Sequence, residues 1–145
     1  MKDSERLENI IYFIIDRTLR KSRQYSVQQL HAHGFDVTLD QWVVIRTVFE
    51  NPGISQKEVA DLTYKDAATL TRILDLIGKK GYVERRPNPN DRRKFELHLT
   101  TAGNELVEQV MPLIFGIRSR GVQGIETADL EAAKRVLNAI FRNFD

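Results

Sequence analysis

Residues 64–103 read YKDAATLTRILDLIGKKGYVERRPNPNDRRKFELHLTTAG, and the two halves of this stretch follow different periods. In the first half apolar residues recur at helical spacing, which predicts a helix over about residues 66–80. Its apolar stripe consists of Leu70, Ile73, Leu74 and Ile77. In the second half, residues 82–86 and 95–99 have the pattern of strands, and the turn-forming residues 87–93 separate them. The stretch therefore predicts a helix followed by a β-hairpin with a long loop.

Two shorter helices are expected before this stretch. Thr38-Leu39-Asp40-Gln41 is a capping box that opens a helix through about Phe49. Ser55-Gln56-Lys57-Glu58 is a second one, opening a short helix with Val59 and Leu62 facing inward. The short connection Thr63-Tyr64-Lys65 makes this helix cross the next one at a steep angle. Helix, short helix, helix, strand, basic loop and strand is the order of a winged helix-turn-helix.

Long helices are predicted on both sides of this region. One runs from Ser4 to about His33, where Gly34 stops it. Another starts at Thr100 or Thr101 and is broken or bent near Pro112, and a last one is capped by Thr127. The fold class is thus mainly α with a small β-hairpin wing. We expect one unit over residues 1–145, with residues 35–100 as the winged helix-turn-helix DNA-binding region.

The flanking helices, residues 4–33 and 101–145, are predicted to dimerise. Residues 10–15 are apolar nearly all round, and such a helix needs burial on more than one side. In so small a protein a second copy of the chain is the expected cover. The residues predicted to form the dimer interface are Leu7, Ile10, Ile11, Ile14, Leu137, Ile140, Phe141 and Phe144.

Composition excludes several kinds of protein. The chain is 41% hydrophobic and 29% charged, an ordinary globular balance. It has no cysteine, which excludes disulfides, a thiolate zinc site and a catalytic cysteine. There is no phosphate-binding glycine loop and no cluster of histidine with carboxylates, so we expect neither an enzyme nor a cofactor. His31 and His33 point to different faces of a helix, so no metal site is expected within one chain.

The sequence also bears on location. The apolar run of residues 10–15 is too short to span a membrane, and no small-residue cleavage site follows it. We therefore expect a cytoplasmic protein without a membrane partner.

Positive charge is concentrated in the middle of the chain. The net charge is only +2, but residues 65–94 hold nine basic and four acidic residues, a net +5. Residues 1–64 carry −1 and residues 95–145 carry −2. A polyanion such as DNA is one partner that would use this concentration, and a solvated charged face is the alternative.

Double-stranded DNA fits the order of elements together with this charge. The first turn of the helix over residues 66–80 carries small and hydroxyl side chains, which let a helix enter a major groove. The hairpin loop offers three cations to a neighbouring groove or backbone. The predicted DNA contacts are Ser55, Gln56, Lys65, Asp66, Ala67, Ala68, Thr69, Thr71, Arg72, Arg85, Asp91, Arg92, Arg93 and Lys94.

The stretch quoted above resembles the multiple-antibiotic-resistance regulator (MarR) family. The resemblance lies in linked motifs in the right order: DAATLTRILD at residues 66–75, KKGYVERRP at 79–87, DRRK at 91–94 and LTTAG at 99–103. It implies a homodimeric transcriptional regulator, a repressor, on a pseudo-palindromic operator. It also implies that Asp91 orients Arg92 or Arg93 for insertion into the minor groove. The sequence departs from the family at Gly78, where a longer side chain is usual, so we expect a flexible or closely packed last helical turn.

The resemblance further implies release from DNA by a small aromatic or acidic ligand. The residues that could line such a site are Tyr12, Arg17, His31, Trp42 and Arg46. The alternative is that these side chains fill and rim the dimer interface. A second alternative concerns the whole protein, because a winged helix also serves as a protein-contact module.

Overall fold

Helix α2 (Leu39–Glu50) forms where the sequence supplies a complete N-terminal cap. In the computed structural model, which describes residues 2–145, the Thr38 side chain accepts from the backbone N–H of Gln41 at 3.1 Å. The Gln41 side chain in turn accepts from the backbone N–H of Thr38 at 3.2 Å. This reciprocal capping box confirms the first predicted helix start.

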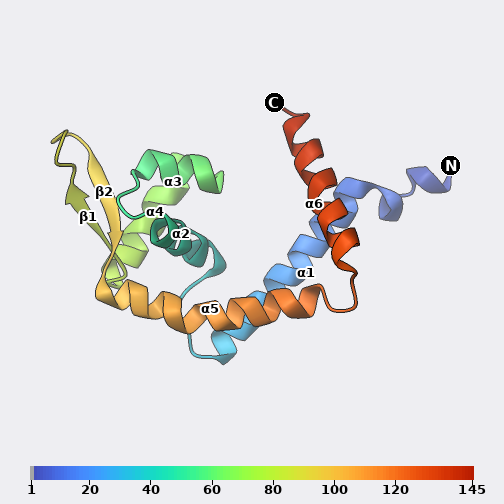
Figure 1. The fold of residues 1–145 in the computed structure, drawn as a ribbon, viewed down its shortest axis with the longest axis horizontal. Coiled ribbons are helices and arrows are strands. Elements are labelled where there is room, and N and C mark those ends of the chain that lie inside the picture. The colour runs from blue at the N-terminus through green and yellow to red at the C-terminus, as the bar shows by residue number, and fades with distance from the viewer. Residues whose placement is uncertain (1) are drawn as a thin grey trace. The chain divides into compact units, whose positions relative to one another are not determined.

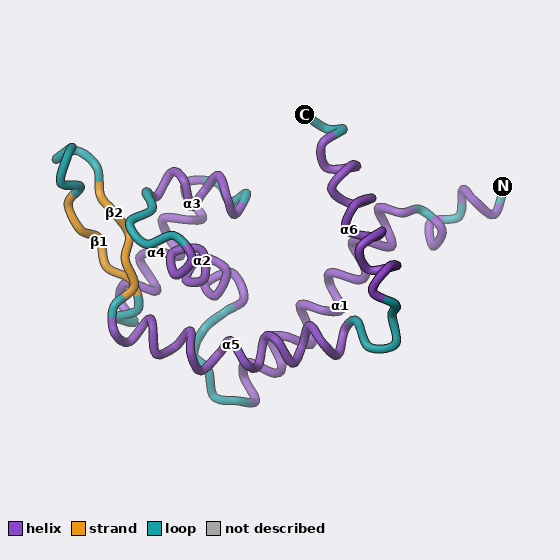
Figure 2. Tube along the Cα trace, in the orientation of Figure 1, coloured by secondary structure: helices purple, strands orange, loops and turns teal. Residues whose placement is uncertain are grey.

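The winged region contains four further elements: α3 (Gln56–Thr63), α4 (Ala67–Lys79), β1 (Val83–Pro87) and β2 (Phe95–Leu99). Ser55 caps α3 by accepting from the Glu58 backbone N–H at 3.1 Å. Helix α2 contacts α3, α4 and β2, so it lies at the centre of this region (Figure 1). Figure 2 shows β1 and β2 in orange, joined by a loop in teal, beside the purple helices.

The hairpin is attached to the helices by a short third pairing. Strands β1 and β2 are antiparallel, with Val83 opposite Leu99 and Pro87 opposite Phe95. Ile54, just before α3, bridges Leu97 of β2, and the Leu97 N–H donates to the Ile54 carbonyl at 2.9 Å. The base of the wing and the start of α3 are therefore held together by backbone hydrogen bonds.

The core of the winged region comes from every one of its elements. The apolar stripe predicted for α4 is buried, as expected. The most buried large side chains within it are Ile45, Leu70, Ile77, Leu97, Val44, Val48 and Val59, and β1 contributes Val83, which is 7% exposed. Val107 and Val110, in the helix that follows the hairpin, are equally buried. Leu62 was expected to face inward and does not, since it is 57% exposed. Phe95 of β2 is 53% exposed.

The flanking helices are α1 (Ile11–Ala32), α5 (Thr101–Gly121) and α6 (Thr127–Arg142). The predicted start of the first helix at Ser4 is wrong. Two short 3-10 turns, Asp3–Glu5 and Leu7–Asn9, come first, and Ile10 is extended. The spacing of Leu7 and Ile10 suits a 3-10 turn as well as an α-helix, which is why the pattern misled.

Two further predictions about the C-terminal part need correction. The helix was expected to be broken or bent near Pro112, and α5 is continuous through that residue, so the predicted break is wrong. Thr127 is the first residue of α6, and the cap position is occupied by Glu126, without a side-chain capping bond. Thr100 does cap α5, because its hydroxyl accepts from the Gly103 backbone N–H at 3.0 Å.

The chain divides into two compact units, Met1–Leu113 and Ile114–Asp145. In the second unit no residue of α6 is buried, and its apolar residues Leu137, Phe141 and Phe144 are 44%, 52% and 75% exposed. Across residues 2–145, none of the helices is both long and apolar enough to cross a membrane.

Candidate nucleic-acid interface

The carboxylate of Asp66 caps the N-terminus of α4. Asp66 accepts from both the backbone N–H and the hydroxyl of Thr69, each at 2.8 Å. These hydrogen bonds, the backbone one first, lower the pKa of Asp66. The chain turns sharply before it, because Tyr64 adopts a left-handed conformation with φ 56°. The cap leaves Ala67 and Ala68 exposed at the tip of the helix, as the prediction of a groove-entering helix requires.

Both predicted hydroxyl contacts on α4 use their protons inside the protein. The Thr69 hydroxyl donates to Asp66, and the Thr71 hydroxyl donates to the Ala67 carbonyl at 2.9 Å. Thr71 also receives a hydrogen bond from the Gln56 amide at 2.9 Å. Each hydroxyl can therefore serve DNA only as an acceptor.

Lys65 forms an ion pair within the protein, whereas Arg72 of α4 forms none with any of residues 2–145. Its ammonium lies 2.9 Å from an Asp40 carboxylate oxygen, and its side chain is 16% exposed. Asp40 also pairs with Arg23 of α1 at 3.2 Å. The hydrogen bond from Lys65 is the largest cause of the lowered pKa of Asp40. Lys65 thus links α2 to the turn before α4, a role that its sequence position did not suggest.

The wing tip presents the three cations predicted for it. The Asn88 N–H donates to the Lys94 carbonyl at 3.0 Å and closes the loop. Within it, the Asp91 carboxylate accepts from the Arg93 backbone N–H at 3.0 Å. Arg92, Arg93 and Lys94 are exposed, and none of them forms an ion pair with any of residues 2–145. Asp91 therefore organises the loop backbone and leaves the guanidinium groups available.

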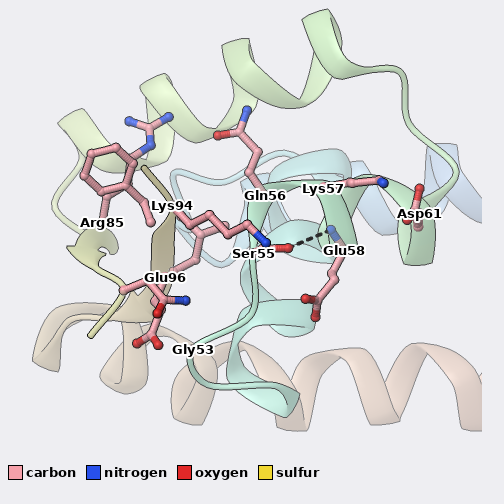
Figure 3. Close-up of a pocket in the computed structure, with 12 residues that line it drawn as sticks. Gly53, Ser55, Gln56, Lys57, Glu58, Asp61, Arg85, Lys94 and Glu96 are labelled. Atoms are coloured by element: carbon pink, nitrogen blue, oxygen red, sulfur yellow. Dashed lines mark hydrogen bonds between the residues drawn. The ribbon is translucent and has the colours of Figure 1, made fainter. Parts of the chain in front are cut away.

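The arginines of β1 have partners. Arg85 approaches Asp75 of α4 at 3.5 Å, a marginal contact, and Arg86 pairs closely with Glu84. Arg85 was predicted to contact DNA, and the structure places it on the same side of the wing as Lys94 (Figure 3).

A cavity of about 570 Å³ lies between the start of α3 and the wing (Figure 3). It brings together four residues predicted separately as DNA contacts: Ser55, Gln56, Arg85 and Lys94. Lys57 and Asn88 also line it and were not predicted. Ile54, just before α3, pairs with Leu97 of β2, which also lines the cavity, and no local sequence signal reveals such a pairing.

The five residues predicted to line a ligand site lie in different surroundings. Trp42 is 3% exposed and belongs to the core. Arg17 lines an open hollow with Leu7 and Phe13, whereas His31 lines another near the start of α2. Arg46 is paired with Glu50 at 2.7 Å and donates to the Met111 sulfur at 3.2 Å. Tyr12 is 53% exposed.

The predicted dimer residues are largely exposed within one chain. Leu7, Ile10 and Ile11 are 61%, 37% and 46% exposed, and Ile14 and Ile140 are partly exposed. Leu137, Phe141 and Phe144, in the second unit, are also exposed.

Comparison with known proteins identifies relatives of this chain. The sequence model of the MarR family matches residues 37–95. The transcriptional repressor MprA of Escherichia coli (strain K12) is 34% identical over 85 residues, 59% of this chain and 48% of that protein. The multiple antibiotic resistance protein MarR of the same strain is 38% identical over 79 residues, 54% of this chain and 55% of that protein. The chain thus spans about half the length of these curated relatives.

Solved structures extend the likeness to almost the whole chain. A mutant E. coli MarR complexed with operator DNA has a TM-score of 0.83 and 26% identity, covering 94% of this chain and 99% of that one. The S. aureus MepR–DNA complex has a TM-score of 0.84 at 19% identity, covering 92% and 98%, and shares the fold. The chain is therefore similar in sequence to the MarR family over residues 37–95, and it is similar to the E. coli MarR structure over almost its whole length.

Proposed function

We propose that the protein is a transcriptional repressor that binds double-stranded DNA in a sequence-specific manner. The related E. coli MprA is named a transcriptional repressor, and the E. coli MarR structure contains operator DNA. Because its partner is the DNA of the cell, we place the protein in the cytoplasm. The alternative use of the winged helix, as a protein-contact module, leaves the wing cations without an anionic partner.

The observation that carries this proposal is the unpaired charge at the wing tip. Arg92, Arg93 and Lys94 project from a loop whose backbone is fixed by Asp91 and by the closing bond of Asn88. Three cations at one tip repel one another and are stabilised by an anion with regularly spaced charges, such as a duplex backbone. Helix α4, with its bare tip of Ala67 and Ala68, would enter the major groove beside it.

We further propose that residues 4–33 and 101–145 form a homodimer and that residues 35–100 bind DNA. The exposed apolar residues of α1 and α6 support this, because a second copy is the simplest cover for them. Such a dimer fits a pseudo-palindromic operator with half-sites about 34 Å apart. Light scattering at micromolar concentration tests it, and a monomeric mass would contradict it.

The salt dependence of duplex binding tests the proposed function. We expect Arg93→Ala to weaken binding to specific and random duplexes alike and to flatten the salt slope by about 0.9 for each phosphate that the variant no longer neutralises. Arg86→Ala is the matched control, since it removes the same charge from a guanidinium that is already paired with Glu84. Wild-type protein without salt-dependent affinity for duplexes would exclude the proposed function.

Release by a small aromatic or acidic ligand remains part of the proposal. Arg17 and His31 line two separate hollows on α1, and either offers a cationic or titratable side chain to an acid. Because Trp42 is buried in the core of the winged region, its fluorescence would report a rearrangement around α2. Titration with salicylate-like acids should change both this fluorescence and DNA affinity, and saturable binding without DNA release would reject the switch.

A further inference from the structure

The Thr71 hydroxyl on α4 lies between two hydrogen-bond partners. Its oxygen is 2.9 Å from the Ala67 carbonyl oxygen and 2.9 Å from Nε2 of Gln56. A hydroxyl has one proton, and a carbonyl oxygen can only accept. Thr71 therefore donates to Ala67 and accepts from the Gln56 amide. This arrangement fixes the amide of Gln56 with its nitrogen toward α4.

The orientation of the Gln56 amide determines which of its hydrogen-bonding groups remain available to a ligand. One of its two N–H groups is used by Thr71, so one N–H and the carbonyl oxygen remain. An amide with one donor and one acceptor side by side matches the N7 acceptor and N6 donor that adenine presents in the major groove. No other base presents that pair of groups in the same arrangement.

Gln56 also lies where a base could be reached. It is the first residue of α3 and is bonded to the second turn of α4, directly after the exposed Ala67 and Ala68. The small side chains at the tip of α4 let the helix approach bases closely. By contrast, Thr69 and Thr71 have no free proton, so each of them offers an acceptor alone.

We propose that Gln56 reads one adenine in the major groove of each half-site and that Thr71 is the residue that positions its amide. This inference rests on the proposed function, because it requires that α4 enters the major groove of duplex DNA. It adds a specificity-determining side chain on α3, outside α4, the helix proposed to enter the major groove.

Selection from a pool of random-sequence duplexes tests the proposal. The full-length protein is mixed with the pool, and the bound duplexes are sequenced to give a preference at each position. We expect the wild type to prefer adenine at a symmetric position of each half-site. Gln56→Ala should reduce the preference at that position by about 5- to 150-fold, which corresponds to one bidentate base contact, and leave the other positions unchanged.

Variants of Thr71 separate positioning from direct contact. Thr71→Val removes the hydroxyl at nearly constant shape and should relax the same position as Gln56→Ala. Thr71→Ser keeps the hydroxyl and should restore it. The double variant Gln56→Ala with Thr71→Val should relax that position no further than Gln56→Ala alone.

Thr47→Val is the matched control. Thr47 on α2 makes the same kind of bond to a carbonyl one turn earlier, that of Val43 at 2.7 Å, and has no glutamine partner. It should leave every position of the selected site unchanged. Thermal unfolding of each variant shows that a reduced preference does not come from impaired folding.

The outcomes distinguish this inference from the proposed function. If the wild type selects a two-fold site and Gln56→Ala selects the same site with the same preferences, the inference is wrong and the proposed function stands. A uniform loss of affinity over all sequences would mean that Gln56 contacts phosphate, and would also overturn it. Selection of a base other than adenine at the relaxed position would overturn the assignment. Wild-type protein that binds no duplex would overturn both.

Discussion

Gly103 is the position at which the structure predicts the strongest effect of adding one methyl group. A Cβ built there would lie 2.1 Å from the carbonyl oxygen of Tyr82 and 3.3 Å from Cβ of Leu99. Non-bonded heavy atoms prefer separations near 3.5 Å, so the Tyr82 carbonyl would have to retreat by more than about 1 Å. That carbonyl accepts the Thr100 backbone N–H at 3.1 Å, so the shift also strains the bond that joins the hairpin to α5.

The magnitude follows from three opposing contributions. Overpacking of this kind costs about 1–3 kcal/mol, and a broken backbone hydrogen bond about 1 kcal/mol. Alanine gains about 1 kcal/mol over glycine within a helix. Gly103→Ala should therefore lower the free energy of unfolding by about 1–3 kcal/mol. For a chain of this length the melting temperature should fall by roughly 3–10 °C.

Gly78→Ala, in the last turn of α4, is the matched control. A Cβ at Gly78 would meet its nearest neighbour, the Val83 carbonyl oxygen, at 3.8 Å, an ordinary contact. The helix gain should then dominate and stabilise the protein by up to about 1 kcal/mol. The two substitutions are chemically identical, so their opposite signs isolate the close approach at Gly103.

Circular dichroism during heating and urea titration would measure both variants. All samples need the same chain concentration, because dimerisation would make the melting temperature depend on it. A Gly103→Ala protein as stable as the wild type would refute the reasoning, since the Tyr82 carbonyl would then move without cost. A destabilised Gly78→Ala protein would show that the last turn of α4 tolerates no side chain.

Two further predictions concern carboxylates. Asp91→Ala should weaken duplex binding although it removes a negative charge, because the Asp91 carboxylate holds the Arg93 backbone N–H at the wing tip; tighter binding in a titration at fixed salt would contradict this role. Asp40→Asn should make the free energy of unfolding less sensitive to acid. The pKa of Asp40 is lowered in the folded protein, chiefly by the hydrogen bond from Lys65. The ionised Asp40 carboxylate therefore stabilises the folded protein above its unfolded pKa of about 3.9, and this stabilisation is lost as pH falls through the folded pKa. Urea midpoints at neutral and acidic pH measure it, and an unchanged difference between the two midpoints would disprove the contribution.

The local order of the winged region was predictable because its signals are local. The caps at Thr38 and Ser55 and the apolar stripe of α4 each depend on residues within a few positions of one another. The change from helical to strand period located β1 and β2 to within one or two residues. Such signals report the chain's own backbone preferences and need no knowledge of the fold.

The errors arose where distant segments decide the outcome. The cavity beside the wing was not predicted, because its lining residues come from the start of α3 and from the hairpin, and Ile54 pairs with Leu97 more than forty residues along the chain. The ion pair of Lys65 with Asp40 was likewise not predicted, because Asp40 lies on another helix; the predicted contact of Lys65 with DNA stays a prediction. The start of α1 was placed too early because a spacing of three residues does not distinguish a 3-10 turn from an α-helix. In each case the deciding contact is tertiary, or the pattern fits two conformations.

Only some of the positive charges of residues 65–94 are free of ion pairs in the described part of the chain. Counting residues 65–94 gives a net +5 and treats all nine cations as equal. In the fold, Lys65, Lys80, Arg85 and Arg86 lie against protein carboxylates. Lys65, Lys80 and Arg86 should therefore release fewer counterions on meeting DNA, since a protein carboxylate already lies beside each of them, whereas the marginal contact of Arg85 compensates its charge less. The salt dependence should come mainly from the wing tip and from Arg72 and Lys79 of α4, neither of which forms a salt bridge with any of residues 2–145. A smaller set of cations, all on two exposed elements, thus makes a more specific case for a DNA interface than the larger count does.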